Sequence, residues 1–267
     1  MGLKVLIRGA GDIASGIALR LCHAGMRVVM TETEHPTTIR RTVAFSEAVI
    51  MGEHTVEDIT AVKAGSPEEA EAIMAEGRIP VLIDPFCDFR EKLSPDAEVD
   101  AILAKKNLGT SISDAGIVIG VGPGFRAGHD CHAVVETMRG HTLGRVYYEG
   151  SALPNTAIPG LIGGFAGERV LRAPADGIFI STGKIGDMVK ENETVGHVDG
   201  VPMKTTIGGV LRGLLSDGVK VTKGMKSGDV DPRGERSYCD LVSDKALSVG
   251  GGVLEAIMHF SDPEKRG

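Results

Sequence analysis

The stretch that decides the fold is residues 3–14, LKVLIRGAGDIA. An apolar run suited to a buried strand precedes a glycine-rich turn, and an apolar pattern of helical period follows it. Gly9, Gly11 and Ala14 fit a G-x-G-x-x-G/A fingerprint, in which Gly9 makes the tight turn and Gly11 lets the backbone approach a pyrophosphate. The stretch therefore predicts the strand, turn and helix that open a nucleotide-binding domain.

A phosphate bound at this turn would meet free N–H groups and the positive end of the helix dipole. Asp12 adds a carboxylate beside it, which is repulsive unless it caps the helix or binds a metal. An acidic residue that ends the second strand, Glu32 or Glu34, would bind a ribose. A plain strand-to-helix turn is the alternative. The predicted binding residues are Gly9, Gly11, Asp12, Ile13, Ala14 and Glu32.

Outward from this stretch, short apolar runs alternate with longer amphipathic ones as far as residue 149, which is typical of strands and helices around a parallel sheet. The expected strands are residues 3–7, 27–31, 80–83, 117–121 and 144–148, and the expected helices are residues 13–24, 67–75, 97–106 and 133–138. The apolar residues of 37–62 fit neither the helical nor the strand period. We expect a Rossmann-like, mostly parallel sheet domain over residues 1–165.

The composition changes after residue 150, where a stretch rich in proline and glycine resembles a linker. Beyond it, a shift of 32 residues superposes Gly177 on Gly209, Gly186 on Gly218, Val189 on Val221, Gly196 on Gly228, Val198 on Val230 and Asp199 on Asp231. Two halves too small to bury their own apolar faces must pack together. We therefore expect a two-half β-sandwich, a barrel-sandwich hybrid of the biotinyl or lipoyl kind, over residues 166–235. Residues 236–267 should form a helical segment that docks on the first domain.

Lys204 follows Met203, as in a biotinyl hairpin, but it lies too close to Gly209 for the hairpin between the two halves. The expected sandwich is therefore an unmodified structural or docking module.

A second glycine loop, GPGFR, follows the expected strand 117–121. Backbone N–H groups in such a turn can form an anion-binding nest, although Pro123 lacks one donor and a rigid turn is an equal alternative. Arg40 and Arg41 could meet a phosphate or form a solvated charged face. These observations add Gly122, Gly124, Phe125, Arg126, Arg40 and Arg41 to the predicted cofactor-binding residues.

The four cysteines are far apart and form no Cys-x-x-Cys, so neither a zinc ribbon nor a disulfide framework is expected, and no metal site is predicted. Cys131 lies between two histidines near an expected helix start, features that lower a thiol pKa. Cys87 follows a strand end. If a thiol is reactive, we expect Cys131 before Cys87; the alternative for this run is a helix-capping Asp130 flanked by exposed histidines.

The composition excludes several partners. A net charge of −7, an aromatic content of 4% and the absence of Trp argue against binding of nucleic acid. We expect neither a signal peptide nor a membrane span, and we expect a cytoplasmic location, with a homo-oligomer left open.

Short motifs are spread over nearly the whole chain: RGAGDIA (8–14), IRRTVAFSEA (39–48), AKKNLGT (104–110), GPGF (122–125), ETMRGH (136–141), PNT (154–156), GDVDPR (228–233), SDKA (243–246) and GGGVLEA (250–256). Through these motifs the chain resembles the YqeB-type accessory proteins of selenium-dependent molybdenum hydroxylase systems. Ala157 departs from that family, which usually has glycine there.

This resemblance implies an accessory protein for maturation of such a hydroxylase, with the hydroxylase or its other maturation factors as partners. Its cofactor would be a nucleotide or other phosphate-bearing molecule, either NAD(P) or a molybdopterin nucleotide. An NAD(P)-dependent oxidoreductase is the alternative. The sequence offers no convincing acid–base pair beside the first loop, which favours the accessory role.

Overall fold

The structure is a computed structural model that describes residues 2–262. The chain forms two compact units, which are described separately. The first unit comprises Met1–Pro36, Ala44–Thr156 and Val242–Gly267, and the second comprises Thr37–Val43 and Ala157–Leu241.

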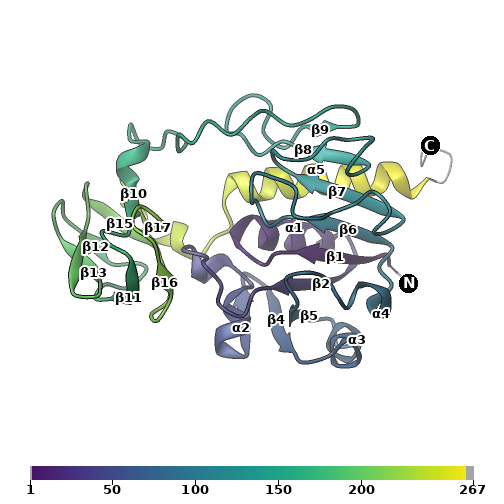
Figure 1. Cartoon of the computed structure of the whole chain (residues 1–267), viewed down its shortest axis with the longest axis horizontal. Helices are drawn as coiled ribbons and strands as arrows, with labels where there is room; N and C mark the ends of the chain where they lie inside the picture. Colours follow the sequence, from purple (N-terminus) through teal and green to yellow (C-terminus); the bar gives the residue numbers. More distant parts are fainter. Residues whose placement is uncertain (1, 263–267) are drawn as a thin grey trace. The chain divides into compact units, whose positions relative to one another are not determined.

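Within the described residues, the first unit is built on a nine-stranded sheet of order β3-β4-β5-β2-β1-β6-β7-β8-β9 (Figure 1). The strands from β4 to β8 in this order run parallel, and the edge strands β3 and β9 run antiparallel to their neighbours. The strands are β1 (Lys4–Arg8), β2 (Arg27–Glu32), β3 (Glu53–Val56), β4 (Ile59–Ala64), β5 (Ile79–Ile83), β6 (Ala97–Asp100), β7 (Ile117–Val121), β8 (Ala133–Val135) and β9 (Val146–Tyr147).

The helices of the first unit are α1 (Asp12–His23), α2 (Glu47–Met51), α3 (Pro67–Ala75), α4 (Arg90–Leu93) and α5 (Asp244–Ser261). The expected helices 13–24 and 67–75 are thus confirmed, and the Ser66 hydroxyl caps α3 by accepting the N–H of Glu69 at 3.2 Å. Helix α5 packs along α1 (Figure 1). Their backbones approach closely, because a Cβ at Gly250 would lie 2.8 Å from the carbonyl oxygen of Gly16.

The expected helix over residues 97–106 is wrong: residues 97–100 form strand β6, and an irregular loop follows. All four strand residues are buried, including the carboxylates of Glu98 and Asp100. Glu98 receives bonds from Arg90 at 2.6 and 3.0 Å, and Asp100 pairs with Arg8 at 3.2 Å. Arg8, 92 residues before Asp100, and Arg90, eight residues before Glu98, therefore compensate the burial of the two charges that give this segment its amphipathic pattern.

The expected helix over residues 133–138 is also wrong, because residues 133–135 form the buried strand β8. Loops rather than helices connect β6, β7, β8 and β9, and the sheet is mixed. The prediction of a Rossmann-like domain followed by a lipoyl-like barrel is therefore wrong: residues 2–262 form few helices, one mixed sheet and two further antiparallel sheets.

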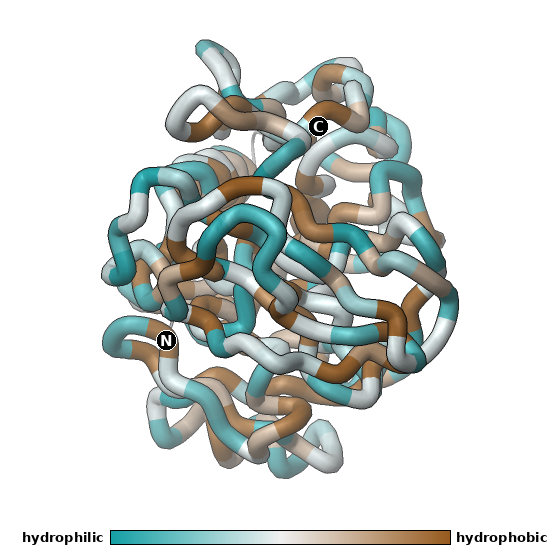
Figure 2. The backbone as a smooth tube through the Cα atoms, turned by 90° about the vertical axis from the view of Figure 1, so that its left-hand side faces the viewer, coloured by the Kyte–Doolittle hydropathy of each residue, from teal (hydrophilic) through white to brown (hydrophobic). Residues whose placement is uncertain are grey.

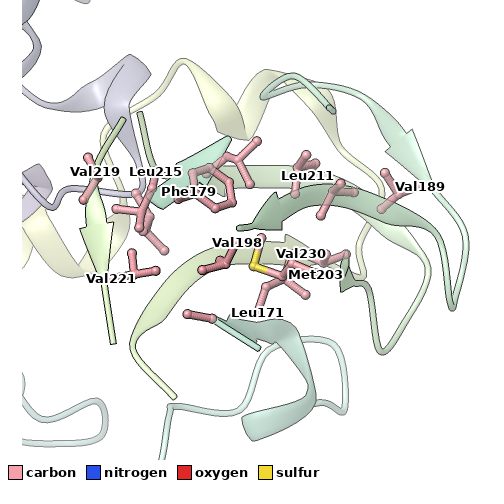
Figure 3. Packing of buried hydrophobic residues seen from close by; sticks show 14 of the residues in the cluster. Leu171, Phe179, Val189, Val198, Met203, Leu211, Leu215, Val219, Val221 and Val230 are labelled. Carbon is pink, nitrogen blue, oxygen red and sulfur yellow. The ribbon is translucent and has the colours of Figure 1, made fainter. Parts of the chain in front are cut away.

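Those two four-stranded sheets make up the second unit, with the orders β10-β17-β15-β12 and β14-β13-β11-β16. The strands are β10 (Val170–Arg172), β11 (Gly177–Ser181), β12 (Met188–Val189), β13 (Thr194–Val198), β14 (Val201–Lys204), β15 (Gly209–Leu214), β16 (Lys220–Val221) and β17 (Lys226–Asp231). Short 3₁₀ turns lie at η1 (Arg41–Val43), η2 (Gly167–Arg169) and η3 (Arg236–Cys239). Both sheets contribute to one apolar core, in which the Phe179 ring is fully buried (Figure 3).

The internal repeat has a structural counterpart in this unit. Gly177 and Gly209 begin corresponding strands with φ of +148° and +151°, and a Cβ at Gly209 would lie 2.3 Å from the carbonyl oxygen of Asp231. Both positions therefore need glycine for the same backbone conformation.

Hydrophobic stretches of the chain, brown in Figure 2, are short and alternate with hydrophilic ones. No helix within residues 2–262 is long and apolar enough to cross a membrane.

Candidate functional site

The two glycine loops lie at one edge of the first unit's sheet. Strands β1, β6 and β7 are parallel neighbours, so the loops that follow them emerge together. A Cβ at Gly9 would lie 3.1 Å from the carbonyl oxygen of Ala101, and one at Gly124 would lie 2.6 Å from the Cα of Lys106. Both glycine loops therefore pack against the loop after β6, and we call residues 9–12, 101–110 and 122–126 together the carboxyl-edge loops.

The chain reverses its direction of winding at this edge. From β1 it passes through α1 to β2 and later to β5 on one side, and after α4 it crosses to β6 on the other side of β1. Ligands of open parallel sheets bind at such a switch point, outside the carboxyl ends of the strands. The carboxyl ends of β1 and β6 define that point here.

Helix α1 begins at the switch point. Its N-cap, Gly11, is extended at φ −68° and ψ −178° and supplies no capping side chain. The Asp12 carboxylate accepts the N–H of Ile13 at 2.9 Å, so it caps the first turn from the side. Ile13 and Ala14 are buried beneath this turn, where they pack rather than reach a ligand.

Glu32 ties the first glycine loop to the end of β2. Its Oε2 accepts the N–H of Ala10 at 3.0 Å, and its Oε1 accepts the N–H of Thr33 at 2.8 Å. One donor of the glycine loop is therefore already used by the protein. A carboxylate has about four acceptor positions, so Glu32 retains capacity for a ligand hydroxyl.

Sequence reasoning missed Arg8 as a site residue. Its guanidinium is buried, donating from Nη1 to Asp100 at 3.2 Å and to Thr110 at 2.5 Å, and from Nη2 to the carbonyl of Pro85 at 3.4 Å. Its Nε has no hydrogen-bond partner among the described residues. The available signal was a charged residue at the end of an otherwise apolar strand. Arg8 joins the ends of β1 and β6 and the loop after β5.

The second glycine loop is mostly structural. The Phe125 ring is buried, and a Cβ at Gly120 would lie 2.5 Å from it. Gly122 donates its N–H to the carbonyl of Val135 at 2.8 Å. Arg126 is exposed, as are Lys105 and Lys106 in the loop after β6. The carboxyl-edge loops therefore present three exposed cationic side chains, those of Lys105, Lys106 and Arg126.

Arg40 and Arg41 belong to the second unit. Arg40 Nη2 donates to the carbonyls of Tyr238 and Leu241 at 3.0 and 3.1 Å, and Arg41 Nε donates to that of Leu214 at 2.9 Å. Both arginines therefore have a structural role within that unit, because their guanidinium groups bind backbone carbonyls.

The run from His129 to His132 does not form a site. His129 pairs with Asp130 at the surface at 3.0 Å, and the Nδ1 of His132 accepts the N–H of Val118 at 2.9 Å. Cys131 is fully buried. Within residues 2–262, no group of three or more His, Cys, Asp or Glu side chains is placed to hold a metal ion.

Glu136, the first residue of the polar run ETMRGH (136–141), has a structural role. Its Oε1 accepts the N–H groups of Thr137 and Met138, each at 2.8 Å, and its Oε2 accepts that of Leu153 at 2.8 Å. This buried carboxylate clamps two loops together, so its residue type is set by structure.

Burial opposes the expected reactivity of the thiols. Burial raises the pKa of Cys131 to about 12 and the pKa of Cys87 to about 11.

We expect iodoacetamide at pH 7.5 to label native Cys22 first, because it is the one cysteine of the four that is partly exposed, although burial raises its pKa to about 11 as well. Peptide mass spectrometry during labelling would measure the order. Faster labelling of Cys131 would show that the thiol is exposed in solution, and labelling in urea provides the control.

Comparison with known proteins places the chain in a family. No family model matches it. It is 55% identical over 254 residues to the "Uncharacterized protein YqeB" of Escherichia coli (strain K12), a match that covers 95% of this chain and 47% of the relative. Over this segment the chain belongs to the YqeB family. It spans about half the length of that relative, whose name assigns no activity.

Among solved structures, the chain matches an aspartoacylase family protein from Mesorhizobium loti at TM-score 0.26 and 13% identity, over 86% of this chain and 85% of the other. It matches a succinylglutamate desuccinylase from Silicibacter sp. at TM-score 0.26 and 12% identity, over 86% and 84%. A succinylglutamate desuccinylase/aspartoacylase from Rhodobacter sphaeroides aligns over 24% and 22%, at TM-score 0.21 and 25% identity.

These comparisons correct the expected function. The three solved structures are named as succinylglutamate desuccinylase or aspartoacylase family proteins, not as molybdenum hydroxylase accessory proteins or NAD(P)-dependent oxidoreductases, so neither role is retained. Similarity at TM-scores of 0.21 to 0.26 transfers no fold, residue role or activity to this chain.

Proposed function

We propose that the first unit binds a phosphate-bearing small molecule at the carboxyl-edge loops. The observation that carries this proposal is the coincidence of the switch point between β1 and β6 with the start of α1, whose N-cap has no side chain. An N-cap without a capping side chain and the positive end of the helix dipole favour an anion.

The electrostatics of the edge support an anionic ligand. Lys105, Lys106 and Arg126 are exposed there, whereas the buried positive charge of Arg8 is paired with Asp100 at 3.2 Å. The negative charges of Asp12 and Glu32 oppose the binding of an anion. Asp12 accepts the N–H of Ile13, and Glu32 accepts the N–H groups of Ala10 and Thr33, which offsets part of each negative charge.

The test is titration calorimetry of the full chain with inorganic phosphate and with ribose 5-phosphate. Gly11→Val should weaken binding at least tenfold, because the new side chain occupies the anion's position while φ and ψ there suit any residue. Reversing both lysines, Lys105→Glu with Lys106→Glu, should weaken binding about tenfold at low salt and less at high salt.

Lys63→Glu is the matched control, since Lys63 is an exposed lysine of the same unit on β4. It should bind like the wild type. If the wild-type chain binds neither inorganic phosphate nor ribose 5-phosphate at millimolar concentrations, the proposed function is wrong.

A further inference from the structure

An exposed aromatic ring lies at the same edge of the sheet as the proposed phosphate site. Phe86 follows β5, and its side chain is 76% exposed. Among the described residues of the first unit, it is the one phenylalanine or tyrosine counted as an exposed large hydrophobic residue. Burying a phenyl ring would stabilise the folded chain by about 1.5–3 kcal/mol. An exposed ring gives up this free energy, and exposed apolar groups at a ligand-binding edge can mark a contact with the ligand.

The turn that displays Phe86 is rigid. The two carboxylate oxygens of Asp84 accept the N–H groups of Asp88 and Phe89, each at 2.9 Å. The Asp84 carbonyl accepts the N–H of Cys87 at 3.2 Å. Cys87 has a left-handed φ of +56° although it is not glycine, and its side chain is buried. Such strain persists only where surrounding contacts enforce it, and it is typical of ligand-contacting turns.

This turn is joined to the first glycine loop. The Pro85 carbonyl accepts a bond from Arg8, the residue before Gly9, at 3.4 Å. The Asp84 N–H donates to the carbonyl of Glu32 at 3.1 Å, and the Glu32 side chain in turn holds the loop after β1. Strand β2 lies between β5 and β1, so the ends of β5 and β1 are two strand spacings apart, roughly 10 Å.

We infer that Phe86 is a specificity-determining platform, on which a planar aromatic ring of the ligand packs while its phosphate lies at the start of α1. Glu32 lies between these two points and accepts hydroxyl groups from the spacer that connects ring and phosphate. The ligand class is thus a phosphate ester of a hydroxylated spacer that carries a flat ring. This inference rests on the proposed function.

The test compares two probes that differ only in the ring, adenosine 5′-monophosphate and ribose 5-phosphate, by titration calorimetry of the full chain. Wild type should bind the ring-bearing probe about tenfold more tightly, which corresponds to the upper range of aromatic contacts. Phe86→Ala should abolish that difference and leave the affinity for ribose 5-phosphate unchanged. Phe86→Tyr should retain the difference, and Met258→Ala, which removes an exposed apolar side chain on α5, should behave like wild type.

The outcomes separate the two claims. If ribose 5-phosphate binds but Phe86→Ala leaves the preference for the ring-bearing probe intact, or if no preference exists, the platform is wrong and the phosphate site stands. Failure of both probes to bind overturns the phosphate site and the platform together. A change in oligomeric mass of Phe86→Ala, with unchanged affinity for both probes, would assign the ring to a protein interface instead.

Discussion

Replacing Asp229 by Ala is expected to lower the free energy of unfolding of the second unit by about 3 to 5 kcal/mol. Asp229 on β17 is buried, and its Oδ1 accepts a bond from Arg169 at 2.6 Å. Its Oδ2 accepts bonds from Nε and Nη2 of Arg212 at 2.9 and 2.5 Å. Removing the carboxylate takes away the counter-charge that two buried guanidinium groups share, and Asp231 still pairs with Arg212 at 2.9 Å.

Hydrogen exchange of the β15 and β17 amides during denaturant titration measures this loss within the second unit. Asp240→Ala is the control, because Asp240 is an exposed aspartate of the same unit. It should change stability by less than about 0.5 kcal/mol. A loss below 1 kcal/mol for Asp229→Ala would mean that water reaches the buried arginines, and the account of this cluster would then be wrong.

The second large effect is expected where α5 crosses its neighbours, at three successive glycines. A Cβ at Gly250 would lie 2.8 Å from the carbonyl oxygen of Gly16, and one at Gly252 would lie 2.3 Å from that of Gly144. Both contacts are with backbone, which cannot move aside alone. Gly250→Ala and Gly252→Ala should each cost about 1–3 kcal/mol through overpacking, and the double variant should cost more.

Gly251 is the matched control within the same helical turn, because a Cβ there would meet no atom within 4 Å. Gly251→Ala should stabilise the first unit by up to about 1 kcal/mol, since alanine is the better helix former. Thermal unfolding followed by circular dichroism, with hydrogen exchange of α1 and α5, measures all three variants. Equal effects at the three positions would show that α5 does not pack on its neighbours as described.

Local pattern was sufficient for the elements whose residues follow one period and carry their own end signals. The run 3–14 predicted β1, the glycine turn and the start of α1, and Ser66 predicted the cap of α3. Both depend on interactions within a few residues. The repeat that aligns Gly177 with Gly209 was readable for a related reason, since a positive φ excludes most other residues.

Elements that depend on distant partners were misread. Residues 97–100 look amphipathic, and they form a buried strand only because Arg8 and Arg90 neutralise their carboxylates from elsewhere in the chain. The local pattern of residues 133–135 predicts the start of a helix, yet pairing with β7 and β9 makes them a strand. Tertiary pairing overrode local propensity in both cases.

The candidate site divides in the same way. The sequence by itself determined that two glycine loops follow apolar strands, because glycine spacing and apolar runs are local properties. Only the tertiary structure decided that the loops pack on residues 101–110, that Cys131 is buried and that Arg8 and Phe86 belong to the same edge. Burial and the charge environment of a side chain depend on the order of strands in the sheet, and that order arises from contacts between residues far apart in the chain.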